Sequence, residues 1–226
     1  MRTWSFCSQK GGVGKTSLSV HLAAYAIANG ESVVIIDLDP QESAKDWHQL
    51  RGDESTPPMV ISALAENVGK LKEAAETLGH TLMIIDTAPS TDAGALAAIR
   101  AADLIIAPVM PNFFDIGALK STVRLIEKAG KLDRAVCVVN GLHYQGTEQD
   151  YQDAKRQVEA IGIRVASAYC VHRRAYARAL KDGKGVTEYT PKDAKAAAEI
   201  HALWAALNTI NPVRTTAAKS RKAKAR

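Results

Sequence analysis

Short apolar runs, rich in β-branched residues, alternate along the chain with longer amphipathic stretches. The runs have the composition of buried strands and lie at residues 4–7, 33–36, 82–85, 104–109 and 135–139, with weaker ones at 59–62 and 163–168. Helical segments are expected near residues 17–28, 41–49, 65–78, 93–101, 116–129 and 148–161, followed by a last helix from Thr190-Pro191 to Leu207. Apolar strands separated by helices predict an α/β fold, a twisted and mostly parallel sheet with helices on both faces. Ligands of such sheets bind at the carboxyl ends of the strands.

A glycine-rich loop joins the first predicted strand to the first predicted helix. It reads Lys10-Gly11-Gly12-Val13-Gly14-Lys15-Thr16-Ser17. Glycines let backbone N–H groups turn inward around a phosphate, and the N-terminus of the following helix adds a partial positive charge. Lys15 is then placed to reach the β- and γ-phosphates of a nucleotide, and the Thr16 hydroxyl to bind Mg²⁺. Residues 11–17 are therefore predicted to bind the nucleotide. The alternative is a glycine-rich turn that caps a helix.

The loop departs from the usual Gly-x-x-x-x-Gly-Lys-Thr/Ser pattern, because Gln9 stands where the first glycine belongs and Lys10 is an additional lysine. In this it resembles the deviant Walker A loop of the ParA/MinD family of P-loop ATPases, and the resemblance extends to about Asn211. The resemblance implies a P-loop NTPase fold, ATP and Mg²⁺ as cofactors, and a homodimer in which Lys10 of one subunit contacts the ATP of the other. Such a cation would neutralise charge on the transferred phosphoryl group. The alternative is a solvated loop lysine.

Two acidic residues follow the strand predicted at 33–36, in the sequence Asp37-Leu38-Asp39-Pro40-Gln41. Carboxylates at the carboxyl edge of a sheet are costly unless a cation lies nearby, and Mg²⁺ with an attacking water would provide the reason. The motif resembles the family's Asp-x-Asp-Pro-Gln switch, which implies that Asp39 positions or activates the hydrolytic water and that Asp37 supports the metal. Turn and helix-cap chemistry is the alternative.

An acid also closes the strand predicted at 82–85. Asp86 fits the Walker B arrangement, in which a carboxylate orients the Mg²⁺ shell, and the following residues, Thr87 to Ser90, resemble the family's second switch. The alternative is a strand-end aspartate that caps the next helix. The predicted metal residues are thus Thr16, Asp37 and Asp86, and the predicted catalytic residues are Lys10, Lys15 and Asp39.

The tip of the strand at 135–139 carries Asn140, followed by Gly141. Members of the family use a residue at this place to read the adenine edge, so the resemblance implies that Asn140 contacts the base. Asn-Gly is also an ordinary turn sequence, which is the alternative.

Basic residues concentrate in two places in the last third of the chain. Residues 171–184 contain five cations against one acid, and by resemblance to the family these bind DNA without sequence preference: Arg173, Arg174, Arg178, Lys181 and Lys184. A solvated amphipathic helix face is the alternative. Residues 212–226 hold six further Lys and Arg and no acid, and they account for the formal net charge of +5. We expect an ATPase domain at residues 1–211 and a disordered basic tail at 212–226, which either strengthens DNA binding or aids solubility.

Several classes of protein are disfavoured. Met1 to Cys7 is no signal peptide, and no apolar run is long enough to cross a membrane. Cys7, Cys137 and Cys170 are far apart, which favours reduced thiols in a cytoplasmic protein and argues against the iron–sulfur branch of the family. The tail lacks the bulky apolar residues of a membrane-binding helix.

The sequence therefore predicts a small ParA-type ATPase without a preceding helix-turn-helix domain. Its expected function is plasmid or chromosome partition, or cargo positioning, driven by ATP hydrolysis in a nucleoid-associated dimer. The expected partners are nonspecific DNA and a ParB-like or cargo-bound protein that stimulates turnover, with no membrane. The alternatives are a MinD-like positioning ATPase that acts on a membrane or protein assembly, and a P-loop phosphotransferase.

Overall fold

A seven-stranded sheet forms the centre of the molecule, with strand order β3-β2-β4-β1-β5-β6-β7. The computed structural model describes residues 1–53, 55–89, 93–146 and 148–211. All strand pairings among them are parallel. The strands are β1 (Arg2–Phe6), β2 (Val33–Asp37), β3 (Met59–Ser62), β4 (Leu82–Asp86), β5 (Leu104–Val109), β6 (Ala135–Leu142) and β7 (Cys170–Val171). The predicted α/β fold is confirmed.

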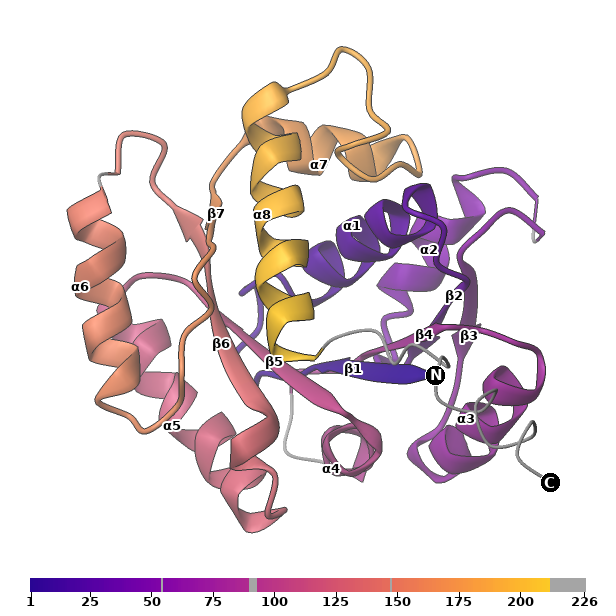
Figure 1. Ribbon diagram of the computed structural model, residues 1–226, viewed down its shortest axis with the longest axis horizontal. Helices are drawn as coiled ribbons and strands as arrows, with labels where there is room; N and C mark the ends of the chain where they lie inside the picture. Colours follow the sequence, from indigo (N-terminus) through magenta and orange to yellow (C-terminus); the bar gives the residue numbers. More distant parts are fainter. Residues whose placement is uncertain (54, 90–92, 147, 212–226) are drawn as a thin grey trace, which may run out of the picture.

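Helices cover both faces of the sheet (Figure 1). One face carries α1 (Lys15–Ala28), α2 (Ser43–Gln49), α7 (Arg174–Lys181) and α8 (Ala194–Ile210). The other carries α3 (Val68–Thr77), α4 (Ala93–Ala101), α5 (Phe113–Lys128) and α6 (Glu148–Glu159), with single 3₁₀ turns at Ala65–Asn67 and Leu132–Arg134. Successive strand residues point to opposite faces, so Ile35 and Ile84 enter the first core while Ile36 and Ile85 enter the second.

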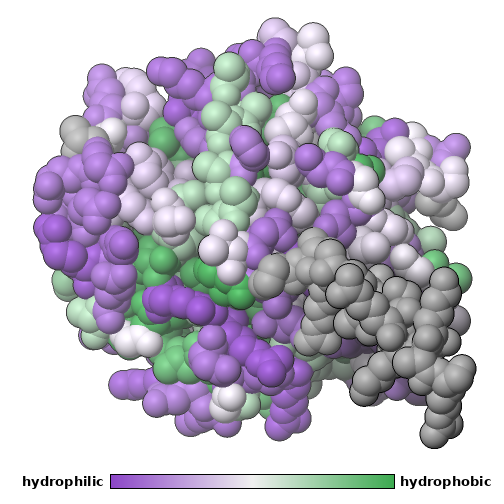
Figure 2. All heavy atoms as spheres, viewed as in Figure 1, coloured by the Kyte–Doolittle hydropathy of each residue, from purple (hydrophilic) through white to green (hydrophobic). Residues whose placement is uncertain are grey.

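The last helix buries one face and exposes small residues on the other. Ile200, Leu203 and Leu207 are fully buried against the core that α1 shares. Exposed alanines on the outer side form the pale strip that runs along α8 in Figure 2, beside the hydrophilic cover over α6. No described helix is both long enough and apolar enough to cross a membrane.

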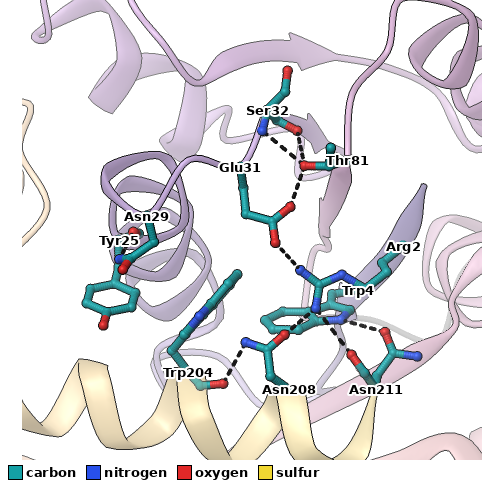
Figure 3. A network of polar contacts seen from close by, with 10 residues as sticks. All are labelled: Arg2, Trp4, Tyr25, Asn29, Glu31, Ser32, Thr81, Trp204, Asn208 and Asn211. Carbon is teal, nitrogen blue, oxygen red and sulfur yellow. Dashed lines mark hydrogen bonds and ion pairs between the residues drawn. The ribbon is translucent and has the colours of Figure 1, made fainter. Parts of the chain in front are cut away.

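The end of α8 is fastened to the amino end of β1 by a buried cation (Figure 3). The Arg2 guanidinium lies 5.3 Å from the ring centre of Trp4 and 5.6 Å from that of Trp204, and it donates to Glu31 at 2.6 Å and to the carbonyl oxygen of Asn211 at 3.2 Å. The Trp4 indole N–H also donates to the Asn211 side chain at 3.1 Å. These contacts fix Asn211 at the amino edge of the sheet, opposite the glycine-rich loop of residues 10–17.

The strand predicted at residues 163–168 does not form. Ile163 and Val165 face one core while Ala166 and Ala168 face the other, so the segment has the alternation of a strand. It makes only one bridge to β6, between Val165 and Cys137. The strand that pairs there is β7, which follows an irregularity in β6. The apolar residues of this segment are buried at the sheet edge, as their pattern predicted. A strand also needs a continuous series of hydrogen bonds to its neighbour, and the apolar pattern does not predict those bonds.

Some helix boundaries also differ from those predicted. Pro191 does not start the last helix, because α8 begins at Ala194, where the Asp193 side chain accepts the N–H groups of Lys195 and Ala196. α5 begins earlier than expected, at Phe113, with Asn112 as its N-cap. The predicted basic tail at 212–226 and Ser90 of the second switch lie outside the described residues.

Candidate nucleotide-binding site

The phosphate loop begins where β1 ends and runs into the first turn of α1. Gly12 and Gly14 have φ angles of 77° and 95°, which only glycine adopts without strain. A Cβ atom on Gly14 would lie 2.2 Å from Asn140 Nδ2, and this nitrogen donates to the Val13 carbonyl oxygen at 2.8 Å. Asn140 therefore packs directly against the loop. No side chain caps α1, which begins at Lys15, and its first N–H groups are suited to an anion.

Lys15 is buried beneath this loop, with 6% of its surface exposed. Its Nζ atom lies 3.4 Å from the Lys10 carbonyl oxygen. Burial lowers the pKa of Lys15, while the negative charges of Asp86 and Asp39 act in the opposite direction. Among the described residues this buried ammonium makes one long hydrogen bond, so it has further N–H donors that can bond to phosphate oxygens.

Asp86 is fully buried at the end of β4, paired in register with Asp37 of β2 and Phe6 of β1. Neither of its carboxylate oxygens has a well-formed hydrogen bond among the described residues, although the Thr16 hydroxyl is close enough to lower its pKa. Burial dominates and raises the pKa of Asp86 to about 7, and the Asp37 charge adds to this effect. Unpartnered carboxylate oxygens beside a hydroxyl and a phosphate loop fit Mg²⁺, which takes oxygen ligands.

The fit to Mg²⁺ also agrees with the small number of ligands present. The described residues contain no group of three or more His, Cys, Asp or Glu side chains that would hold a metal by themselves. Nucleotide-bound Mg²⁺ uses one or two protein ligands and completes its shell with phosphates and water. Thr16 and Asp86 are placed for that role.

The carboxylate of Asp37 is occupied by backbone groups. Its Oδ1 atom accepts the Asp39 N–H at 3.0 Å, and its Oδ2 atom accepts the N–H groups of Ala44 at 3.0 Å and Lys45 at 3.4 Å. Asp37 thus caps the start of α2, which is the alternative weighed for this motif. A role of Asp37 at the metal stays a prediction.

Asp39 is partly exposed on the same edge. Its Oδ1 atom accepts the Gln41 N–H at 2.9 Å, so the side chain stabilises the turn into α2. Its charge also opposes the lowering of the Lys15 pKa, which places the two groups in the same electrostatic environment. The predicted role of Asp39 in water activation is compatible with this position and stays a prediction.

The additional lysine, Lys10, lies at the rim of the loop. Its side chain is 49% exposed, and its Nζ atom lies 3.6 Å from Asp115 Oδ1 at the start of α5. Asp115 is itself buried and held by Asn112, whose side chain donates to Asp115 Oδ2 at 3.0 Å and accepts the Asp115 N–H at 2.9 Å. Lys10 is therefore neither buried nor unpaired, and a short movement of its side chain would free it.

A cavity of about 270 Å³ continues from the phosphate loop toward the ends of β6 and β7. Glycines of the loop and the first turn of α1 form one wall, and residues after β7 form the other. The lining residues are Gly12, Gly14, Ser17, Leu18, Met110, Asn140, Gly141, Val171, His172, Arg173, Tyr176, Ala177 and Leu180.

The five predicted DNA-binding residues fall into two groups. Arg174, Arg178, Lys181 and Lys184 are exposed, on α7 or just after it, and have no ion pair with any described residue. Arg173 differs, because its guanidinium forms an ion pair with Glu199 of α8 at 2.7 Å and its side chain is only 21% exposed. Its charge is already neutralised within the chain.

Comparison with known proteins identifies the family. Residues 4–186 match the model of the CobQ/CobB/MinD/ParA nucleotide binding domain. The chain belongs to this family. The predicted ParA/MinD membership is confirmed, and the matched range includes the phosphate loop described above.

Individual relatives support the same assignment. This ParA/MinD-family chain is 32% identical to maintenance of carboxysome distribution protein A from Gloeobacter kilaueensis over 191 residues, which are 83% of this chain and 85% of the relative.

Solved structures of family members share the fold. A Cyanothece McdA variant in complex with ATP is 17% identical, with a TM-score of 0.70, and the match covers 95% of this chain and 98% of that one. MinD from Pyrococcus horikoshii in complex with Mg-ADP is 15% identical, with a TM-score of 0.72, and covers 95% and 99%. The ligands of these two proteins, ATP and Mg-ADP, agree with the cofactors that the resemblance implied, ATP and Mg²⁺.

Sequence reasoning missed two acids that organise this ParA/MinD-family site. Asp115 holds Lys10, and its signal was an Asn-x-x-Asp spacing at a helix start. Glu199 holds Arg173, and its signal was a single acid within an alanine-rich helix. Neither signal names the partner, which depends on the packing of distant segments.

Proposed function

We propose that this protein is a ParA-type ATPase that positions a cargo by switching between a nucleotide-bound dimer on DNA and a released state. The observation that supports it best is the set of charged groups around the phosphate loop. Lys15 and Asp86 are buried there with unused hydrogen-bonding capacity, while Lys10 lies exposed at the rim. This combination suits a site that binds a triphosphate within one subunit and offers a cation to another.

The hydrolysis step follows from the roles of these residues. Bound Mg²⁺ would supply charge neutralisation at the phosphates. Lys15 would bind the β- and γ-phosphates, the Thr16 hydroxyl and Asp86 would hold the metal shell, and Asp39 would orient the attacking water. Because these groups are fixed by strand ends and a helix start, their preorganisation lowers the cost of reaching the transition state.

The dimer is supported by the position of Lys10. In the proposed closed state, Lys10 leaves Asp115 and contacts the nucleotide of the partner subunit, so that each subunit completes the other's site. A nucleotide that binds the closed dimer more tightly than the open state increases the population of closed dimers, and the size of the shift is set by the difference between the two affinities.

The proposed DNA contact is the surface formed by Arg174, Arg178, Lys181 and Lys184. Exposed cations without internal partners can neutralise backbone phosphates, which needs no base recognition. Arg173 is the weaker candidate because Glu199 already pairs with it. A closed dimer would present two such surfaces together, and nucleoid association would follow.

Similarity to a relative supports the proposed role in positioning a cargo. A relative is named for the distribution of carboxysomes, which favours cargo positioning as the general role. In the proposed cycle a ParB-like or cargo-bound protein accelerates hydrolysis and releases the dimer from DNA.

The test is an Asp39→Ala variant assayed together with the wild type. We expect it to bind ATP and dimerise normally but to hydrolyse ATP at least about 100-fold more slowly, because positioning of the water is lost. DNA binding should require ATP in both proteins and should persist longer in the variant. Normal turnover by the variant would reject the role of Asp39, and wild-type DNA affinity that is equal with ATP, ADP and no nucleotide would reject the switch.

A further inference from the structure

Glu199 fastens α8 to the segment that joins β7 to α7. Its Oε2 atom accepts the Val171 N–H at 3.0 Å and lies 2.8 Å from the Tyr176 hydroxyl, while its Oε1 atom accepts from Arg173 Nε at 2.7 Å. The Glu199 side chain is 14% exposed. One carboxylate therefore holds the segment at its start, its middle and its first helical turn.

The held segment forms one wall of the cavity beside the phosphate loop. Val171, Arg173 and Tyr176 all line that cavity, opposite Gly12 and Gly14. Glu199 itself does not line it, so it acts on the cavity only through the residues that it holds. If phosphates bind at the loop, the attached nucleoside extends into this space.

The segment also carries the exposed cations. On α7, Ala175 and Ala179 face the core, whereas Arg174, Arg178 and Lys181 face solvent. Tyr176 and Leu180 of the same helix line the cavity. The orientation of α7 thus sets both the cavity wall and the direction of the basic face, and in Figure 1 the helix lies across the end of α8 from which Glu199 comes.

We propose that Glu199 is a positioning residue that couples occupation of the nucleoside cavity to the basic face of α7. The coupling to DNA rests on the proposed function, whereas the effect on nucleoside binding does not. A nucleoside that contacts Val171 and Tyr176 stabilises one orientation of the segment. Because the Glu199 carboxylate binds the segment at three points, the same orientation fixes α7 with its cations facing solvent.

Glu199→Gln tests the effect on the cavity, because it keeps the size of the side chain and removes its charge. We expect the affinity for a non-hydrolysable ATP analogue with Mg²⁺ to fall about tenfold, the effect of losing one charge-assisted hydrogen bond. The affinity for inorganic tripolyphosphate with Mg²⁺, which needs only the phosphate loop, should change by less than about twofold. Both are measured by calorimetry.

Glu31→Gln is the matched control. Glu31 is also mostly buried and also pairs with an arginine, Arg2, but it lies at the opposite edge of the sheet. This variant should leave both affinities at the wild-type values even if its melting temperature falls. Unchanged affinity of Glu199→Gln for the ATP analogue would overturn the proposal. An equal loss of both ligands would also overturn it, because it would indicate a general structural role.

The second arm measures the ratio of DNA affinities with and without the ATP analogue. In Glu199→Gln this ratio should fall at saturating analogue, and in Glu31→Gln it should match the wild type. A Glu199→Gln ratio equal to that of the wild type would overturn the coupling. A wild type that binds no DNA in any nucleotide state would instead reject the proposed function, and the comparison of ATP analogue with tripolyphosphate would still decide whether Glu199 positions the cavity wall.

Discussion

Lys10 and Lys15 belong to one short loop but occupy opposite environments. Lys15 is buried and, within the described part of the chain, makes one long hydrogen bond to a backbone carbonyl, whereas Lys10 is half exposed and paired with Asp115. A buried ammonium is costly to leave without acceptors, so Lys15 gains most from a bound anion. The ion pair is long, at 3.6 Å, only its Lys10 side is exposed, and the buried Asp115 keeps its two hydrogen bonds to Asn112, so Lys10 can leave at modest cost.

Asp115→Asn is predicted to favour the dimer. Asparagine keeps the shape of the side chain at the start of α5 but removes the charge that holds Lys10 within its own subunit. The dimer dissociation constant with a non-hydrolysable ATP analogue should fall by about twofold to fivefold, the effect expected for a long ion pair whose cation is half exposed. Sedimentation velocity at several concentrations measures it.

The control for this prediction is the double variant Lys10→Gln with Asp115→Asn. If the gain arises from release of Lys10, the double variant should dimerise less well than the wild type. An equal gain in both variants would show that Asp115 opposes dimerisation by some other route.

At the residue scale, the sequence predicted which side chains gather at the site but not their surroundings. The loop motif and the strand-end acids placed Lys10, Lys15, Asp37 and Asp86 at one edge because parallel strands end together. Whether a carboxylate at that edge is free or occupied depends on neighbouring backbone groups. Among the described residues Asp86 has oxygens without a well-formed hydrogen bond, whereas Asp37 accepts three N–H groups, a difference that no spacing rule reveals.

At the scale of elements, Asp37 connects β2 to α2. Asp37→Ala should lower the free energy of unfolding by about 1–2 kcal/mol, because it removes the acceptor for the first N–H groups of α2. Asp39→Ala is the comparison, since that side chain accepts one N–H among the described residues, that of Gln41, and is partly exposed. Urea unfolding of both variants measures the difference, and equal losses would contradict a capping role specific to Asp37.

His21 joins α1 to the segment after α7. Its Nδ1 atom accepts the Val186 N–H at 3.1 Å, and burial lowers the pKa of His21 to about 3, although Glu188 acts in the opposite direction. The pKa is therefore below the ordinary value of 6.5, and the unfolded chain takes up the proton first. The stability that neutral His21 provides is complete above pH 6.5 and is lost as the pH falls toward 3.

His21→Asn should remove this pH dependence, because the asparagine oxygen can accept the Val186 N–H without titrating. Between pH 6 and pH 4.5 the unfolding free energy of the wild type should fall more steeply than that of the variant, by about 1.4 kcal/mol per pH unit. Denaturant unfolding at several pH values measures both slopes. Parallel slopes would mean that His21 is already charged in the folded protein.

Strands were predicted well at the centre of the sheet, where a buried apolar run is also hydrogen-bonded to neighbours on both sides. β2 and β4 are central strands, buried on both faces, and their apolar runs gave their positions directly. The segment at 163–168 has a weaker apolar run, interrupted by Arg164 and Ser167, and lies at the sheet edge, where pairing depends on the local course of β6. Pattern alone does not separate these cases.

At the scale of the whole molecule, the sheet separates two kinds of polar cluster. The phosphate loop, Asp37 and Asp86 lie at the carboxyl edge, where Lys15 and Asp86 have hydrogen-bonding capacity left for a ligand among the described residues. Arg2 at the amino edge is instead held by Glu31, Asn208 and Asn211 between two indole rings. The first cluster is arranged for binding and the second for holding α8 in place, and α8 in turn carries Glu199, which holds residues of the cavity wall.

If the basic surface on α7 binds DNA, the DNA affinity and its dependence on salt should depend on where the cations lie and not on the net charge of the protein. Replacing Arg174, Arg178, Lys181 and Lys184 by glutamine should weaken DNA binding in the presence of ATP by at least about tenfold at moderate salt. The slope of log affinity against log salt should become shallower by about 0.9 for each DNA phosphate that the variant no longer neutralises. Fluorescence anisotropy with a random duplex over a range of salt concentrations measures both.

The matched control replaces four exposed cations that have no ion pair among the described residues, on α3 and α5 at the other face of the sheet: Lys70, Lys120, Arg124 and Lys128. Both quadruple variants lower the formal net charge from +5 by the same amount. If DNA contacts α7, only the first variant should bind more weakly and with a shallower slope. If attraction is set by overall charge, the two variants should weaken alike, and the assignment of the DNA-binding surface to α7 would then be wrong.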